Sequence, residues 1–169
     1  MNPTHPTPSE IAGAIAQSFA SLPTRLGRDR TPREWTTQLK DDMGSLGVTH
    51  GWDVCTSGFS ERFDCEWLFD LTWYRNDADG HLSETYLVLE SEWNGAFADI
   101  KYTFEKLLVA KATLKVMVFQ GFDFNLSELF ASLERGIRAF QKRSPDETYI
   151  LAAFNNSTYA FDVRQVNGA

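Results

Sequence analysis

Three carboxylates in two acidic segments are the residues best suited to chemistry. Asp70 lies in EWLFDLTWY, and Glu90 and Glu92 lie in TYLVLESEW. Because side chains alternate between the two faces of a strand, Glu90 and Glu92 share one face, and Asp70 can meet them there if the two strands pair. Like charges so close repel, so the cluster is spread into solvent, partly protonated or neutralised by a cation. A divalent metal is the most interesting of these answers.

The same alternation predicts what lies on the opposite face. The first segment, Glu66 to Tyr74, would place four apolar side chains there: Trp67, Phe69, Leu71 and Trp73. The second segment, Thr85 to Trp93, would place four residues on the face opposite its acids: Leu87, Leu89, Ser91 and Trp93. Glu66 would lie near the end of the acidic row.

The residues between and after these strands predict how the strands are arranged. RNDADGHLSE contains Asp79-Gly80, a hairpin-turn dipeptide, so the two acidic strands are expected to be antiparallel neighbours. Apolar residues at helical spacing follow Gly95, and the apolar run from Leu114 to Gln120 is typical of a buried strand beside a parallel neighbour. Strand, helix and strand together predict a right-handed crossover.

The N-terminal part of the chain predicts a tail and two helices. Residues 1–9 form a proline-rich tail ending at Ser9, a suitable N-cap, and the helix that follows ends where Pro23 interrupts the pattern. Thr31 and Pro32 predict the start of a second helix, and Gly47 its end.

The remaining segments complete one domain over residues 10–169. A strand is expected within Gly51 to Ser57, a helix from about Leu126 to Lys142, and a closing hairpin around Asn155-Asn156-Ser157. The length of 169 residues and the 43% hydrophobic content suit a single core.

Charge and cysteine content limit the class of protein. The formal net charge of −7 argues against coating nucleic acid by bulk electrostatics, although a local basic groove remains compatible with it. Cys55 and Cys65 are too few for a disulfide scaffold and lack metal-like spacing, so we expect them reduced in a cytoplasmic protein. No membrane span or signal peptide is indicated.

The order of elements together with Asp70 and Glu90-Ser91-Glu92 resembles the PD-(D/E)xK, or restriction-endonuclease-like, superfamily. The resemblance covers roughly Thr31 to Gln120. It implies an α/β fold with a mixed central sheet flanked by helices and an αβββαβ core. Glu92 stands where the family usually has Lys, a departure that some restriction enzymes share. Lys101 or Lys106 on the following helix would then supply the cation, and Glu34 matches the extra acid that many members add.

The resemblance implies a metal-dependent nuclease that hydrolyses phosphodiester bonds. Asp70 and Glu90 would hold Mg²⁺ or Mn²⁺, Glu92 would orient or deprotonate the attacking water, and Lys101 or Lys106 would contact the phosphate. Either of two basic patches could hold the nucleic-acid backbone, the stronger one formed by Arg25, Arg28, Arg30 and Arg33 and the other by Arg135, Arg138, Lys142 and Arg143.

Other interpretations remain open. Glu90 and Glu92 also suit a solvated strand face, the lysines a solvated helix face, and Glu34 a favourable first-turn charge. A nuclease-like core without catalysis would instead act as a regulatory module whose acidic face binds a basic protein partner. A homodimer through the aromatic-rich face or the C-terminal hairpin is the third alternative.

Overall fold

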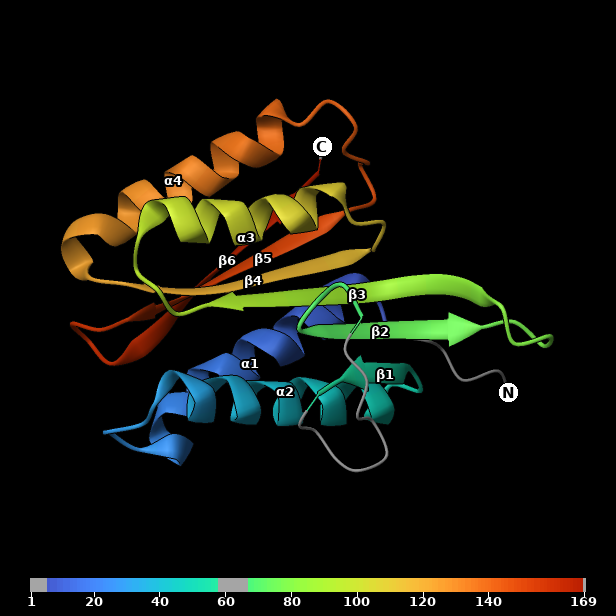
Figure 1. Cartoon of the computed structure of the whole chain (residues 1–169), viewed down its shortest axis with the longest axis horizontal. Helices are drawn as coiled ribbons and strands as arrows, with labels where there is room; N and C mark the ends of the chain where they lie inside the picture. The colour runs from blue at the N-terminus through green and yellow to red at the C-terminus, as the bar shows by residue number, and fades with distance from the viewer. Residues whose placement is uncertain (1–5, 58–66, 169) are drawn as a thin grey trace.

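The computed structural model describes residues 6–57 and 67–168, which fold into four helices and a six-stranded sheet (Figure 1). The helices are α1 (Pro8–Leu26), α2 (Pro32–Thr49), α3 (Phe97–Val109) and α4 (Asp123–Ala139). The strands are β1 (Asp53–Thr56), β2 (Leu71–Asn76), β3 (Leu82–Glu92), β4 (Leu114–Gly121), β5 (Thr148–Asn155) and β6 (Ala160–Asn167).

The sheet is mixed and follows the order of the chain. Its strands run β1-β2-β3-β4-β5-β6. The pairs β1–β2, β2–β3 and β5–β6 are antiparallel, whereas β3–β4 and β4–β5 are parallel. The chain is therefore a single α/β domain with a mixed sheet, as predicted, and the antiparallel acidic strands and the parallel strand after them are confirmed.

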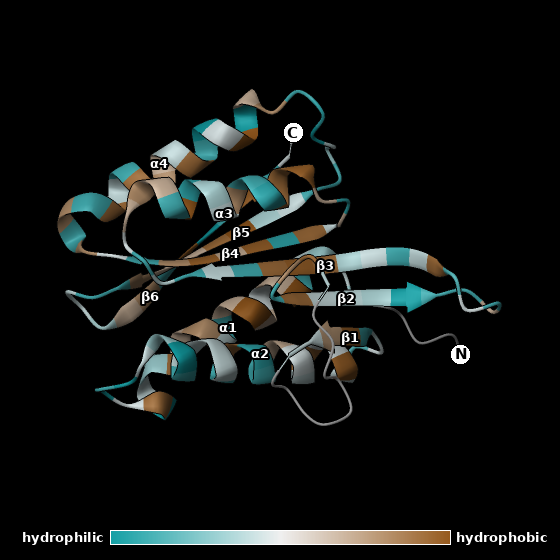
Figure 2. Ribbon diagram, viewed as in Figure 1, coloured by the Kyte–Doolittle hydropathy of each residue, from teal (hydrophilic) through white to brown (hydrophobic). Residues whose placement is uncertain are grey.

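Helices cover both faces of this sheet. In Figure 1, α3 and α4 lie on one side of the strands and α1 and α2 on the other. Two apolar cores result. Leu87 and Leu89 of β3 belong to the core beneath α1 and α2, and Val88 between them belongs to the core beneath α3 and α4. The predicted alternation of β3 is therefore correct, and Figure 2 shows the hydrophobic colouring concentrated on the central strands.

The first helix begins earlier and ends later than the sequence indicated. Its N-cap is Thr7, which forms a capping box with Glu10, so the helix starts within the stretch assigned to the tail. Pro23 lies inside the helix, in its last turn. A proline so near the end disrupts few helical hydrogen bonds, and termination falls instead at Gly27, whose φ of 75° is the left-handed conformation that glycine favours.

The second helix also continues past its predicted end. Gly47 lies within α2, which runs to Thr49. The glycine is needed there because the Trp73 indole packs against it: a Cβ atom would lie 2.6 Å from the indole nitrogen. That nitrogen also donates a hydrogen bond to the carbonyl of Met43. Close approach to the sheet, not helix termination, explains this glycine.

Two more boundaries differ from the prediction. The helix expected over Leu126 to Lys142 is α4, which begins at Asp123 and ends at Ala139. The first acidic strand was expected from Glu66, but β2 begins at Leu71. Glu66 and Cys65 lie outside the described residues.

The late start of β2 changes the faces of the residues before it. Leu71 packs into the core beneath α1 and α2, whereas Phe69 packs against the core beneath α3 and α4. The prediction that these two side chains share a face is wrong, because strand alternation applies only within the strand.

Among the helices described, none is long and apolar enough to cross a membrane.

Candidate functional site

Asp70 lies immediately before β2, beside the end of β3. One of its carboxylate oxygens accepts hydrogen bonds from the Ser91 amide at 2.8 Å and the Ser91 hydroxyl at 2.7 Å. The other oxygen lies 3.8 Å from the ammonium of Lys40 on α2. The Asp70 carbonyl accepts a hydrogen bond from the Thr56 hydroxyl of β1. These contacts hold Asp70 on the side of the sheet that α2 covers.

Glu90 lies on the opposite side, beneath α3. Its side chain is almost completely buried, and one of its oxygens lies 2.5 Å from the ammonium of Lys106. The Lys106 side chain is 41% exposed, so it reaches from solvent to a buried carboxylate. A buried carboxylate requires such a partner, because its desolvation is otherwise very costly.

Glu92 ends β3 and faces the start of α3. Its carboxylate accepts hydrogen bonds from the Asn94 amide at 2.7 Å and, more weakly, from the Thr103 hydroxyl at 3.4 Å. The Asn94 side chain in turn donates to Asp99 in the first turn of α3. Glu92 is thus held by the loop that leads into the helix.

Three acids and two lysines lie around the end of β3, and we call them the β3-end cluster: Asp70, Glu90, Glu92, Lys40 and Lys106. The sequence predicted that the three acids would share one face. The structure instead divides the cluster between the helix layers, with Asp70 and Lys40 on the α2 side and Glu90 and Lys106 on the α3 side. The irregular backbone before Leu71 is the reason, because it frees Asp70 from the alternation of β2.

Lys40 is the member of the cluster that the sequence analysis missed. It is 6% exposed and also donates a hydrogen bond to the Ser57 hydroxyl at 3.1 Å. A signal was present in the sequence, since Lys40 lies three residues before Met43 and therefore borders the apolar stripe of α2. A lysine at such a position needs an acidic partner nearby.

The two lysines proposed to contact phosphate have different positions. Lys101 pairs with Glu105 one turn along α3, and both side chains are about half exposed. Lys106, in contrast, contacts Glu90. Of the two, only Lys106 belongs to the β3-end cluster.

Glu34 is engaged at the N-terminus of α2. Its carboxylate accepts hydrogen bonds from the Thr31 amide and hydroxyl and pairs with Arg30 at 2.9 Å. The Thr31 amide bond is the largest of the effects that lower the pKa of Glu34 to about 2. Within the described residues, no contact joins Glu34 to the β3-end cluster, and its interactions are those of a capping residue.

The predicted arginine patch lies around the turn between α1 and α2. Arg28 lies over the ring of Tyr159 at 4.7 Å from its centroid, and Arg30 donates to the Leu26 carbonyl as well as to Glu34. Arg33 is exposed in the first turn of α2. Arg25 lies apart from them and pairs with Asp42 of α2.

A different set of side chains forms the compact acidic group. In the described part of the chain, the three-residue group whose ligand atoms lie within 4.8 Å of one another is Asp77, Asp79 and His81, in the β2–β3 turn. All three are exposed, and Asp77 accepts hydrogen bonds from the amides of Asp79 and His81. Turn geometry accounts for this group.

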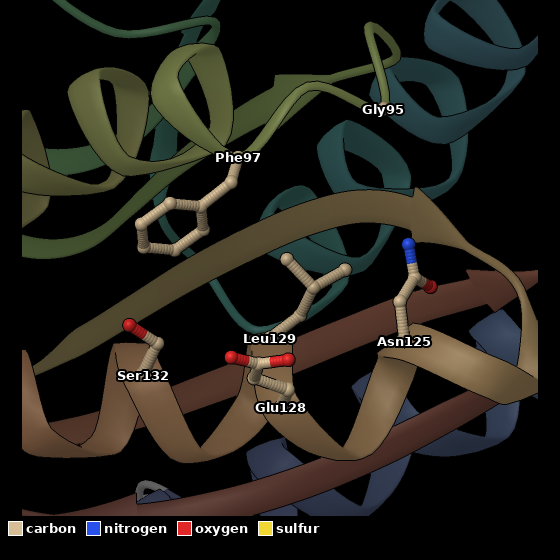
Figure 3. Close-up of a pocket in the computed structure, with 6 residues that line it drawn as sticks. All are labelled: Gly95, Phe97, Asn125, Glu128, Leu129 and Ser132. Carbon is tan, nitrogen blue, oxygen red and sulfur yellow. The ribbon is translucent and has the colours of Figure 1, made fainter.

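A hollow of about 340 Å³ lies between the start of α3 and the side of α4. Figure 3 shows the Phe97 ring, at the start of α3, projecting towards Leu129 and Ser132 of α4, with Glu128 and Asn125 along the same wall. The opening thus lies where β3 leads into α3.

Comparisons with protein-family models, curated proteins and solved structures found no significant match to this chain.

Proposed function

We propose that the β3-end cluster is the site of a metal-dependent nuclease-like protein that hydrolyses phosphodiester bonds. Asp70 and Glu90 supply oxygen ligands for Mg²⁺ or Mn²⁺, Glu92 orients the attacking water, and Lys106 contacts the phosphate. The observation that carries the proposal is that Asp70 is hydrogen-bonded to Ser91, the residue between Glu90 and Glu92, with Asp70 on the α2 side of the sheet and the Glu90–Lys106 pair on the α3 side.

The order of elements supports the resemblance on which this proposal builds. A helix, three antiparallel strands, a second helix and a strand parallel to the third follow one another as α2, β1, β2, β3, α3 and β4. Within that order, Asp70 precedes the second strand, and Glu90 and Glu92 end the third. Because these strands are antiparallel, the start of one lies beside the end of the other.

The position of Lys106 supports the proposed replacement of the missing motif lysine. The residue after Ser91 is Glu92, so β3 itself offers no ammonium group there. Lys106 brings one to Glu90 from α3. A partly exposed ammonium beside a buried carboxylate can release that carboxylate to a metal ion and turn to a substrate phosphate.

Titration calorimetry with Mn²⁺ tests the proposal. The starting protein should carry Asp77→Asn, which disables the exposed turn group as a competing site. In this background we expect one Mn²⁺ site. Asp70→Asn and Glu90→Gln should each abolish it, because each removes one of the two carboxylate ligands.

Lys101→Gln is the matched control, since Lys101 lies on the same helix but pairs with Glu105. Mn²⁺ binding should be unchanged in this variant. Binding that survives both Asp70→Asn and Glu90→Gln would overturn the proposal, and so would the absence of Mn²⁺ binding at millimolar concentration.

One observation favours the second candidate function, a catalytically inactive relative that acts as a protein-binding or regulatory module. Each acid of the cluster already has a protein partner: Ser91 for Asp70, Lys106 for Glu90 and Thr103 for Glu92. Carboxylates that are hydrogen-bonded or ion-paired in this way are stable without a metal. This second function predicts no Mn²⁺ site at Asp70 and Glu90, and salt-sensitive binding of a basic protein partner instead.

A further inference from the structure

A second pocket lies at the carboxyl ends of the three parallel strands. It has a volume of about 220 Å³ and lies where β3, β4 and β5 end, at Trp93, Gln120 and Asn156. In open α/β sheets, ligands bind preferentially outside the carboxyl ends of the strands. The start of α2 closes the pocket from the side, through Pro32 and Trp35.

Aromatic rings form most of its wall. Trp35 packs against Phe154 with ring centroids 4.7 Å apart and against Trp93 at 5.9 Å. Tyr159 meets Phe154 edge-on at 5.2 Å. Trp35 and Phe154 are nearly buried, whereas Trp93 and Tyr159 are half-buried, so the latter two present ring surface to the pocket. Such a wall suits a flat aromatic ligand.

Backbone strain is concentrated at the same place. Among the described residues, two that are not glycine have positive φ angles, Asp29 at 65° and Tyr159 at 57°, and both line this pocket. A left-handed conformation costs about 1–2 kcal/mol for a residue with a bulky side chain. Glycine or asparagine would fit the turn with less strain, but Tyr159 gains contacts that offset this cost: its hydroxyl donates to the Gly27 carbonyl and its ring packs against Phe154.

Polar groups stand at the edge of the aromatic wall. The Gln120 amide donates to the Trp93 carbonyl, and the Asn156 amide donates to the Gln120 side chain at 3.2 Å. Carboxamides at such an edge can pair with the edge of a nucleobase. Two guanidinium groups are near: Arg28 lies over the Tyr159 ring, and Arg30 lines the pocket together with Asp29 and is also paired with Glu34.

We infer that this pocket binds a nucleotide, with the base against Tyr159 and Trp93 and the phosphate at Arg28 and Arg30. The volume is below the roughly 300–1,000 Å³ of pockets that enclose whole small-molecule ligands, so it suits one ring system with the phosphate outside. The nucleotide is either free or an unpaired residue of a nucleic-acid strand.

This inference deepens the proposed function and rests on it for the choice of a nucleic-acid component as ligand. Trp93 directly follows Glu92, so the pocket begins one residue beyond the β3-end cluster. A strand held at the cluster could therefore place a neighbouring base in the pocket. Base binding itself requires no metal, which allows the two ideas to fail separately.

Tryptophan fluorescence in the presence of EDTA measures nucleotide binding directly. We expect 5′-AMP to change the emission saturably, because Trp35 and Trp93 form the wall. Ribose 5-phosphate, which lacks a base, should not. Tyr159→Phe retains the ring and should bind 5′-AMP like the natural protein. Tyr159→Asn, which tolerates the left-handed backbone but lacks the ring, should bind roughly tenfold more weakly.

Two further variants control for misfolding and for nonspecific effects. Arg28→Gln changes an exposed side chain and should weaken 5′-AMP binding several-fold while leaving adenosine binding unchanged. Tyr102→Asn removes another exposed aromatic ring, on α3, and should change nothing. Thermal unfolding followed by circular dichroism verifies that each variant is folded.

The outcomes separate the sources of the ligand and the two proposals. Single-stranded hexa-adenylate that binds at least tenfold more tightly than 5′-AMP, and is displaced by it, indicates a nucleic-acid strand; similar affinities indicate a free nucleotide. Binding of 5′-AMP by a protein that keeps Asp70 and Glu90 but shows no Mn²⁺ site there would retain the pocket and overturn the nuclease proposal. The inference is overturned if 5′-AMP, adenosine and hexa-adenylate all fail to bind, or if both Tyr159→Asn and Arg28→Gln bind 5′-AMP as tightly as the natural protein.

Discussion

A lysine–glutamate pair lies near each end of the parallel strands, and the two pairs differ in their access to solvent. Near the amino end of β4, Lys115 is fully buried, with its ammonium 2.9 Å from Glu147 and 3.2 Å from the Tyr149 hydroxyl. That hydroxyl donates to the same Glu147 oxygen at 2.9 Å. At the end of β3, Glu90 is paired with Lys106, whose side chain is 41% exposed.

The difference teaches that a perturbed pKa alone does not identify a functional site in this protein. Burial lowers the pKa of Lys115 and raises that of Tyr149. Each group of that network nevertheless has its partners within the protein. The pair at the end of β3, in contrast, has one member that reaches solvent. Access to solvent, not a shifted pKa, distinguishes the candidate site from the closed network.

The largest effect on stability is expected at the closed network. Lys115→Met leaves the Glu147 carboxylate and the Tyr149 hydroxyl without their common partner and should lower the free energy of unfolding by about 3 kcal/mol. Urea denaturation measures this change. The double variant Lys115→Met/Glu147→Gln should recover part of the loss, because no uncompensated charge remains. A single-variant loss below about 1 kcal/mol would show that the network is not structural.

A smaller loss is expected at the open pair. Lys106→Met should lower the free energy of unfolding by about 1–2 kcal/mol, because Glu90 remains buried without its ammonium partner. The same variant should bind Mn²⁺ at least as tightly as the natural protein, since lysine no longer competes for the carboxylate. A loss as large as that of Lys115→Met, together with weaker Mn²⁺ binding, would make the two pairs equivalent and contradict the comparison.

The smallest effect is expected at Glu34, whose pKa is strongly shifted although it lies outside both pairs. Its pKa of about 2 in the folded protein is below the ordinary value of 4.5, so its contribution to stability is present above pH 4.5 and is lost as the pH falls towards 2. Glu34→Gln should therefore reduce the pH dependence of unfolding in that window.

Mn²⁺ binding provides the functional part of this test, with Glu105→Gln as an exposed control on α3. Glu34→Gln should bind Mn²⁺ like the natural protein, because the carboxylate caps α2. Loss of Mn²⁺ binding in Glu34→Gln but not in Glu105→Gln would show that Glu34 is a metal ligand, as the sequence suggested.

Much of the fold could be predicted because local patterns determine it. Alternation in β3, the Asp79-Gly80 turn and the apolar run of β4 predicted an antiparallel pair followed by a parallel strand, and the sheet has both. Boundaries that depend on distant contacts could not be predicted in this way. Gly47 looked like a helix end because the indole of Trp73, which packs against it, is remote in sequence.

The candidate site was predicted in composition but not in geometry. The sequence identified Asp70, Glu90 and Lys106, yet extending the alternation of β2 back to Glu66 placed Asp70 on the face of Glu90. The strand begins at Leu71, and Asp70 instead meets Ser91 and Lys40. Lys40 was missed because its role depends on a contact between α2 and the start of β2, and the helical pattern alone does not identify that contact.

Anomalous diffraction from crystals soaked in Mn²⁺ tests the central claim most directly, because it locates the ion. We predict a peak bound by both Asp70 and Glu90, with Lys106 moved away from the Glu90 carboxylate to admit the metal. A peak confined to Asp77, Asp79 and His81, with the contact between Lys106 and Glu90 intact, would contradict the account.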